Sequence, residues 1–169
     1  MSQTVSDNTS LLRLLPEGRY VGSGTYSFSE KASQLHKLES SAMLSHSELL
    51  LTLDGTFSLP SGAKHGFKLD LELPKDDAGK GYFVFRFEPL VEVLGVLGNV
   101  DGGTYLLAGR SKEPPTQLSC HLELVDDRSL KLQGLLAYED FKWLTWSLAV
   151  KNYDPQKARE AVVSLPKRA

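Results

Sequence analysis

Phe67-Lys68-Leu69-Asp70-Leu71-Glu72-Leu73 is the stretch that decides the fold class of this chain. Apolar residues stand at every second position of this stretch, and charged residues fill the positions between them. Because successive side chains of a β-strand point to opposite faces, the pattern predicts a strand with one apolar and one charged face. The same rhythm of short runs, interrupted by Gly, Asp and Pro, extends from about residue 18 to about residue 152. The sequence therefore predicts an all-β protein.

The number and spacing of these runs predict how the strands are arranged. We count about nine to ten strands joined mostly by short, hairpin-length loops, so neighbours in sequence should be neighbours in space. An open sheet of this length would expose two unpaired edges, whereas closure removes both. We therefore predict a closed up-and-down antiparallel β-barrel of about 8–10 strands, with a two-sheet sandwich as the alternative architecture.

Two segments inside the barrel region have unusual sequences. Gly22 and Gly24 share one face of the first strand, which indicates a bend or a close approach of another backbone. Leu90 to Leu97 keeps helical spacing of its apolar residues, but Gly95 and Gly98 disfavour a helix there, and we assign it as a strand.

The chain is predicted to be a single domain over 1–169, with two short helical additions to the barrel. Residues 1–8 are polar and are expected to be flexible, and one helical turn should follow through Leu15 before Pro16 ends it. At the other end, Asp154 as N-cap and Pro155 at the first helical position predict a helix over 155–165.

Composition excludes several classes of function. The 19 basic and 21 acidic side chains give a net charge of −2, which removes the broad positive field that nucleic-acid binding needs. Cys120 is the single cysteine, so no intramolecular disulfide can form, and its place among alternating apolar residues predicts a buried thiol. No secretory signal and no apolar run long enough for a transmembrane segment is recognised, so we expect a cytoplasmic protein.

The stretch Gly18-Arg19-Tyr20-Val21-Gly22-Ser23-Gly24 resembles the first strand of the calycin superfamily, in particular of lipocalin-like barrels. Tyr20 stands where lipocalins carry the tryptophan of a Gly-x-Trp motif. The order of a helical turn, a glycine-spaced strand, a meander and a C-terminal helix is also similar. The resemblance implies a barrel whose interior holds a small ligand.

The same stretch is similar to the nitrobindin-type haem barrels. Those barrels are expected to carry a proximal histidine on a late strand, and no histidine follows His121 in this chain. We therefore expect no haem, and no other cofactor is indicated. The spacing of the four histidines matches no zinc pattern, so no metal site is predicted.

Five residues are candidates for contact with a ligand: Tyr20, Arg86, Tyr105, His121 and Trp146. Arg86 interrupts an aromatic strand, and inside a barrel its guanidinium could bind an anion; if it points outward instead, Glu88 and Glu92 are the candidate partners. Trp146 shares a strand face with leucines and a valine. His121 alternates with Ser119 and Glu123, a set that faces solvent if Cys120 faces inward.

These observations favour a binding protein over an enzyme. The preferred hypothesis is a small hydrophobic or amphipathic ligand inside the barrel. An isomerase or lyase that uses the barrel mouth is an alternative, for which Arg86, His121, Tyr20 and Tyr105 would have to converge. A filled-core structural or interaction domain is the third reading, and an exposed apolar patch would be its sign. The ligand's identity and the oligomeric state are not encoded in these patterns.

Overall fold

The computed structural model describes residues 11–31, 33–48, 50–74, 80–87, 91–113, 115–138 and 142–154. Ten strands make up most of these residues: β1 (Gly18–Phe28), β2 (His36–His46), β3 (Leu50–Ser58), β4 (Lys64–Glu72), β5 (Gly81–Phe87), β6 (Val91–Asp101), β7 (Thr104–Lys112), β8 (Pro115–Asp126), β9 (Ser129–Tyr138) and β10 (Lys142–Asn152). Two short 3₁₀ helices, η1 (Leu11–Leu14) and η2 (Ser29–Lys31), flank β1.

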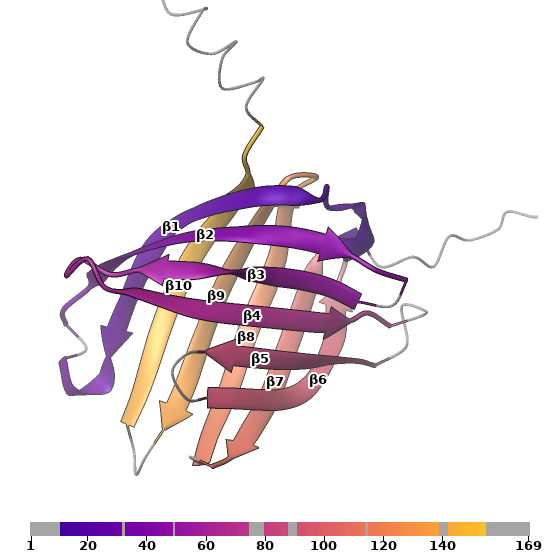
Figure 1. Cartoon of the computed structure of the whole chain (residues 1–169). Helices are drawn as coiled ribbons and strands as arrows, with labels where there is room; N and C mark the ends of the chain where they lie inside the picture. The colour runs from indigo at the N-terminus through magenta and orange to yellow at the C-terminus, as the bar shows by residue number, and fades with distance from the viewer. Residues whose placement is uncertain are drawn as a thin grey trace, which may run out of the picture.

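The strands form a closed barrel in the order β1-β10-β9-β8-β7-β6-β5-β4-β3-β2. Each strand pairs antiparallel with its sequence neighbours, and β1 closes the barrel against β10, with Tyr20 opposite Asn152 and Tyr26 opposite Trp146. In Figure 1, strands β1 to β5 cross in front of β7 to β10, which run steeply behind them, and β6 bends from the first group to the second. The predicted up-and-down barrel is confirmed, and the sandwich alternative is wrong. Residues 91–97 of the ambiguous stretch lie in strand β6, as predicted, and Leu90 lies outside the described residues.

Apolar side chains at every second position of the strands point inward and fill the interior of the barrel. The stretch that decides the fold class lies in and just after β4, where Phe67, Leu69 and Leu71 are buried and Lys68, Asp70 and Glu72 face outward. Cys120 is 5% exposed, as its sequence position predicts. At Gly24 the backbones of β1 and β10 lie so close that a Cβ atom would overlap the carbonyl oxygen of Ser147. The close approach predicted from the glycines of the first strand is therefore present.

One end of the barrel, which we call the closed end, is covered by η1. Leu12 of this helix is fully buried, and Leu15, just after it, is 3% exposed. The Tyr20 hydroxyl donates a hydrogen bond to the Pro16 carbonyl oxygen at 2.8 Å, and the His46 ring contacts the Leu15 carbonyl oxygen at 2.7 Å. The predicted N-terminal helical turn is thus present as a 3₁₀ helix. Residues 1–8 and the helix expected over 155–165 lie outside the described residues.

Burial of Tyr20 predicts a loss of stability at alkaline pH. Burial raises the pKa of Tyr20 from 10.0 to about 12, against a smaller opposing effect of Arg128. Because the folded protein holds this proton more tightly, the stabilisation is fully present below pH 10 and is lost as pH rises toward 12. We expect the free energy of unfolding, measured by urea titration at a series of pH values, to fall by about 2 kcal/mol over this interval.

The matched variant for this experiment is Tyr20→Phe. It should cost about 1 kcal/mol at neutral pH through the lost hydrogen bond to Pro16. Burial also raises the pKa of the Cys120 thiol to about 12, so the variant should keep the part of the alkaline loss that Cys120 causes. An alkaline profile identical in both proteins would show that Tyr20 does not contribute.

Candidate ligand-binding site

The opposite end of the barrel, which we call the open end, has a different inner surface. Here β1, β3, β5, β7 and β9 end, and the even-numbered strands begin. Five aromatic side chains on the inner face are only partly buried, although each packs against the core. They are Tyr26, Phe57, Phe85, Phe87 and Trp146, and we call them the aromatic lining. The aromatic rings of the lining are therefore partly exposed at the open end, whereas η1 covers the core at the closed end.

One half of the aromatic lining is a stack of phenylalanines across β3, β4 and β5. Phe57 stacks on the buried ring of Phe67, with centroids 4.3 Å apart and an interplanar angle of 17°. Phe87 lies 5.9 Å from Phe57 and 6.4 Å from Phe85. The His65 ring is 5.9 Å from Phe87 and ends this row at the rim. These contacts hold the rings in fixed positions, as a ready-formed apolar surface requires.

The other half of the lining lies on β1, β2 and β10. Tyr26 stacks on His36, with ring centroids 5.1 Å apart, and meets Phe28 edge to face at 5.7 Å. Opposite Tyr26, the Trp146 indole lies over Gly134 of β9, where any Cβ atom would overlap the ring. The glycine thus provides the space that lets the indole lie flat against the inner wall.

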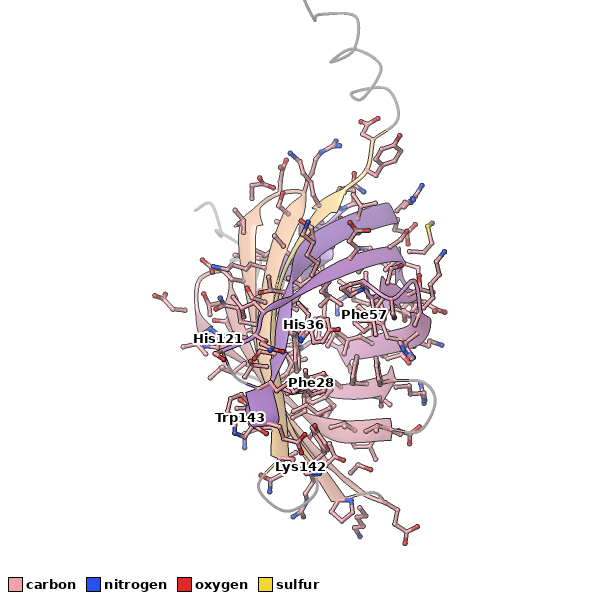
Figure 2. The ribbon with its side chains drawn as sticks, turned by 90° about the vertical axis from the view of Figure 1, so that its left-hand side faces the viewer. Phe28, His36, Phe57, His121, Lys142 and Trp143 are labelled. Atoms are coloured by element: carbon pink, nitrogen blue, oxygen red, sulfur yellow. The ribbon has the colours of Figure 1, made fainter. Side chains whose placement is uncertain are left out.

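Charged groups at the open end lie on its rim. The Lys142 ammonium pairs with the Glu30 carboxylate of η2 at 3.1 Å, and both side chains are substantially exposed. Figure 2 shows Phe28, His36 and Phe57 between the two walls of the barrel, with Lys142 near the lower edge of the opening. Among the described strand residues, no carboxylate faces the interior. In the part of the chain that the structure describes, the inner surface at the open end therefore carries aromatic rings and no acidic side chain.

A hollow lies apart from this lining, at the end of β7, the start of β8 and the end of β9. It has a volume of about 450 Å³ and is lined by Arg110, Lys112, Thr116 and Gln117 among others. Since Arg110, Lys112 and Gln117 are exposed positions of their strands, this hollow opens to the outer surface.

The five residues predicted to contact a ligand are distributed over three regions. Trp146 belongs to the aromatic lining. Tyr20 and Tyr105 are 0% and 1% exposed and lie in the core toward the closed end. Arg86 and His121 are exposed on the outer surface, and Figure 2 shows His121 apart from the residues at the opening. The structure therefore does not bring these five side chains together.

Arg86 takes the outward of its two predicted orientations. Its guanidinium pairs with Glu92 at 2.9 Å, as one of the two anticipated partners, and with Asp70 at 3.2 Å. The hydrogen bond that Arg86 donates to the Glu92 carboxylate is the main reason that the pKa of Arg86 is raised above its usual value. Because β4, β5 and β6 are neighbours, this network crosses three strands on the outside of the barrel. Glu88, the other anticipated partner, lies outside the described residues.

Four members of the aromatic lining were not singled out from the sequence: Tyr26, Phe57, Phe85 and Phe87. Alternation places each of them on an apolar face, but it does not distinguish the open end from the closed end. That distinction depends on η1, which packs over only one end. Their position was a usable signal, because all four lie within two residues of the end of a strand.

Two further searches concern the described residues only. Within them, no three His, Cys, Asp or Glu side chains gather in a way that could hold a metal ion. Nor does any helix in those segments have the length and apolar character needed to cross a bilayer.

The closed barrel has a counterpart among solved structures. This chain is similar in fold to a phycobiliprotein lyase. The matching structure is the S-type phycobiliprotein lyase CPES from Guillardia theta, with a TM-score of 0.62 over 91% of this chain and 98% of that one. Sequence identity is 13%, so the likeness is one of fold alone, and it agrees with the barrel predicted from the sequence. No family model and no curated protein sequence matches the chain.

Proposed function

We propose that this protein binds a small hydrophobic or amphipathic ligand inside the barrel, at its open end. The observation that carries the proposal is the aromatic lining, five inward-facing rings that the rest of the chain leaves partly uncovered. Apolar surface of this kind gains free energy when a ligand removes it from water, by about 25 cal/mol per Å². Barrel mouths are also among the usual places for small-molecule sites.

The fold neighbour is compatible with this proposal. It is named a phycobiliprotein lyase, and it shares the barrel over nearly its whole length. An isomerase or lyase activity of the present chain has less support, because the four side chains considered for it do not surround one cavity. Arg86 and His121 face outward, and Tyr20 and Tyr105 lie toward the closed end. We therefore favour binding over catalysis, and a cytoplasmic location remains a prediction from the sequence.

Fluorescence titration tests the proposal directly. The chain has two tryptophans, so Trp143→Phe leaves Trp146 as a reporter within the lining. Nile red serves as a neutral apolar probe, and biliverdin, an open-chain tetrapyrrole, serves as a second probe because the fold neighbour is a phycobiliprotein lyase. We expect saturable, one-site binding of at least one probe, with energy transfer from or quenching of Trp146.

Variants separate the open end from the outer surface. Phe87→Asp should abolish binding because it places a charge in the lining, and Phe87→Ala should weaken binding if the Asp variant does not fold. Met43→Glu is the matched control, because Met43 is 56% exposed on the outer face of β2. If neither probe binds saturably, or if Met43→Glu and Phe87→Asp change affinity equally, the proposed site is wrong.

A further inference from the structure

Three inward-facing side chains form a row across neighbouring strands at the open end. The pairing register places Trp146 of β10 opposite Tyr26 of β1, and Tyr26 opposite His36 of β2. All three are partly buried, and His36 shares its face of β2 with the buried Leu38. Directly opposite residues on one face of a sheet have their Cβ atoms about 5 Å apart. The indole, phenol and imidazole are therefore neighbours on the inner wall, and we call them the ring row.

The ring row contains two polar groups that can still form hydrogen bonds. The His36 ring stacks on Tyr26 at 5.1 Å with an interplanar angle of 26°, and neither ring forms a hydrogen bond through its polar atoms with another described residue. His46, on the same face of β2, instead contacts the Leu15 carbonyl oxygen at the closed end. Since no buried side-chain nitrogen or oxygen within the described ranges lacks a partner, the polar atoms of Tyr26 and His36 are accessible to solvent or a ligand.

The electrostatic surroundings of these two groups favour an anion. No carboxylate faces the interior among the strand residues that the structure describes, and Glu30 of η2 is already paired with Lys142 at 3.1 Å. A tyrosine hydroxyl and an imidazole N–H both donate hydrogen bonds, and a carboxylate has two oxygens to accept them. Such bonds are stronger when the acceptor is ionised. The polar end of the ring row is therefore suited to a carboxylate.

The other end of the ring row is a flat apolar surface. The Trp146 indole lies over Gly134 of β9, where a Cβ atom would overlap the ring. The backbone of β9 thus covers one face of the indole, and the other face is left toward the interior. Aromatic rings prefer to stack with an offset on such a face. This end is therefore suited to the ring of an aromatic ligand.

We propose that the ligand of this barrel is an aromatic carboxylic acid, with its ring on the Trp146 indole and its carboxylate hydrogen-bonded by Tyr26 and His36. The inference rests on the proposed function, because it names the class of ligand that the same open end takes. The phenylalanines in the other half of the aromatic lining have no hydrogen-bonding group and contact only the apolar body of the ligand. Because the indole and the two donors are neighbours, the linker between the ligand's ring and its carboxylate is short.

A matched pair of fluorescent probes tests the preference for a carboxylate. Pyrenebutyrate and pyrenebutanol share one ring system and one chain length, and differ in their carboxylate and hydroxyl groups. Binding to the full chain carrying Trp143→Phe is followed by energy transfer from Trp146 to pyrene. We expect pyrenebutyrate to bind about tenfold more tightly at neutral pH. Equal affinities, or tighter binding of the alcohol, overturn this inference and leave the proposed function standing. If neither probe binds saturably, both are overturned.

Two substitutions remove the donors and keep the rings. Tyr26→Phe and His36→Phe should each lower the ratio of the two probe affinities by about threefold, and the double variant should bring it to about one. Pyrenebutanol should bind all of these variants about as tightly as before. Tyr82→Phe and His121→Phe make the same changes on the outer surface, so they should keep the wild-type ratio. A double variant that keeps the full preference for pyrenebutyrate overturns the inference.

Trp146→Leu tests the stacking surface. It removes the indole and keeps an apolar side chain, so both probes should lose affinity by about fivefold while their ratio is unchanged. Pyrene emission follows binding to this variant, because the tryptophan reporter is absent. Near-ultraviolet circular dichroism confirms that each variant is folded. Unchanged affinity for both probes would show that the ligand's ring does not lie on Trp146.

Discussion

Phe83→Ala is expected to lower the free energy of unfolding by about 4 kcal/mol, the largest effect of any single substitution considered for this barrel. The Phe83 side chain is 2% exposed and lies in the centre of the inner wall of β5. Its ring lies against two glycines on the inner face: a Cβ atom at Gly95 of β6 would come within 2.6 Å of the ring, and one at Gly109 of β7 within 2.7 Å. Truncation would remove the ring from a wall that has no side chains there to fill the space.

The cost of this cavity is high because the neighbours cannot collapse into it. Gly95 and Gly109 have no side chains, and the backbones of β6 and β7 are held by their ladder. Phe83→Leu should therefore recover more than half of the loss. Guanidinium unfolding, followed by tryptophan fluorescence, measures all of these values.

Tyr82→Ala is the matched control for Phe83→Ala. Tyr82 is the preceding residue on the same strand, but it points outward and is 55% exposed. We expect a change within about 0.5 kcal/mol. A loss at Tyr82 as large as the loss at Phe83 would contradict the assignment of inner and outer faces on β5.

The architecture could be predicted because it depends on local periodicity. The alternation of Phe67 to Leu73 assigns the faces of one strand, and short loops make each strand pair with the next. Closure then follows from the cost of free edges. The same reasoning cannot locate the open end, because that depends on the long-range packing of η1, through Leu12, against the other end of the barrel. Four of the five members of the aromatic lining were missed for this reason, and only Trp146 was predicted.

The orientation of Arg86 shows a second limit of the sequence. Alternation with Phe85 and Phe87 favours an outward side chain, whereas the apolar composition of the strand permits a buried anion site. The register of β5 decides between them, because it places Arg86 beside Lys68 on β4 and Glu92 on β6. Such cross-strand neighbours cannot be read from one strand. Asp70, which also pairs with Arg86, was not anticipated for the same reason.

Gly24→Ala is expected to destabilise the barrel by about 3 kcal/mol or more, although it adds only one methyl group. The added Cβ atom would overlap the Ser147 carbonyl oxygen and the Leu148 Cα on β10. These are backbone atoms within the ladder that closes the barrel, since Gly24 pairs with Leu148. No rotamer change can relieve the overlap, so β1 and β10 would have to separate at this point. The free energy of unfolding in guanidinium measures the effect.

Gly98→Ala is the control. It shows whether the loss at Gly24 comes from steric overlap or from replacing any strand glycine with alanine. Gly98 lies within β6, and a Cβ atom built there meets nothing within 4 Å. Alanine also reduces the conformational freedom of the unfolded chain, so Gly98→Ala should be neutral or stabilising by about 0.5 kcal/mol. If both variants lost stability equally, the effect would be a general property of glycine in these strands. A large loss at Gly24 alone would instead show that β1 and β10 close the barrel through a contact that only glycine permits.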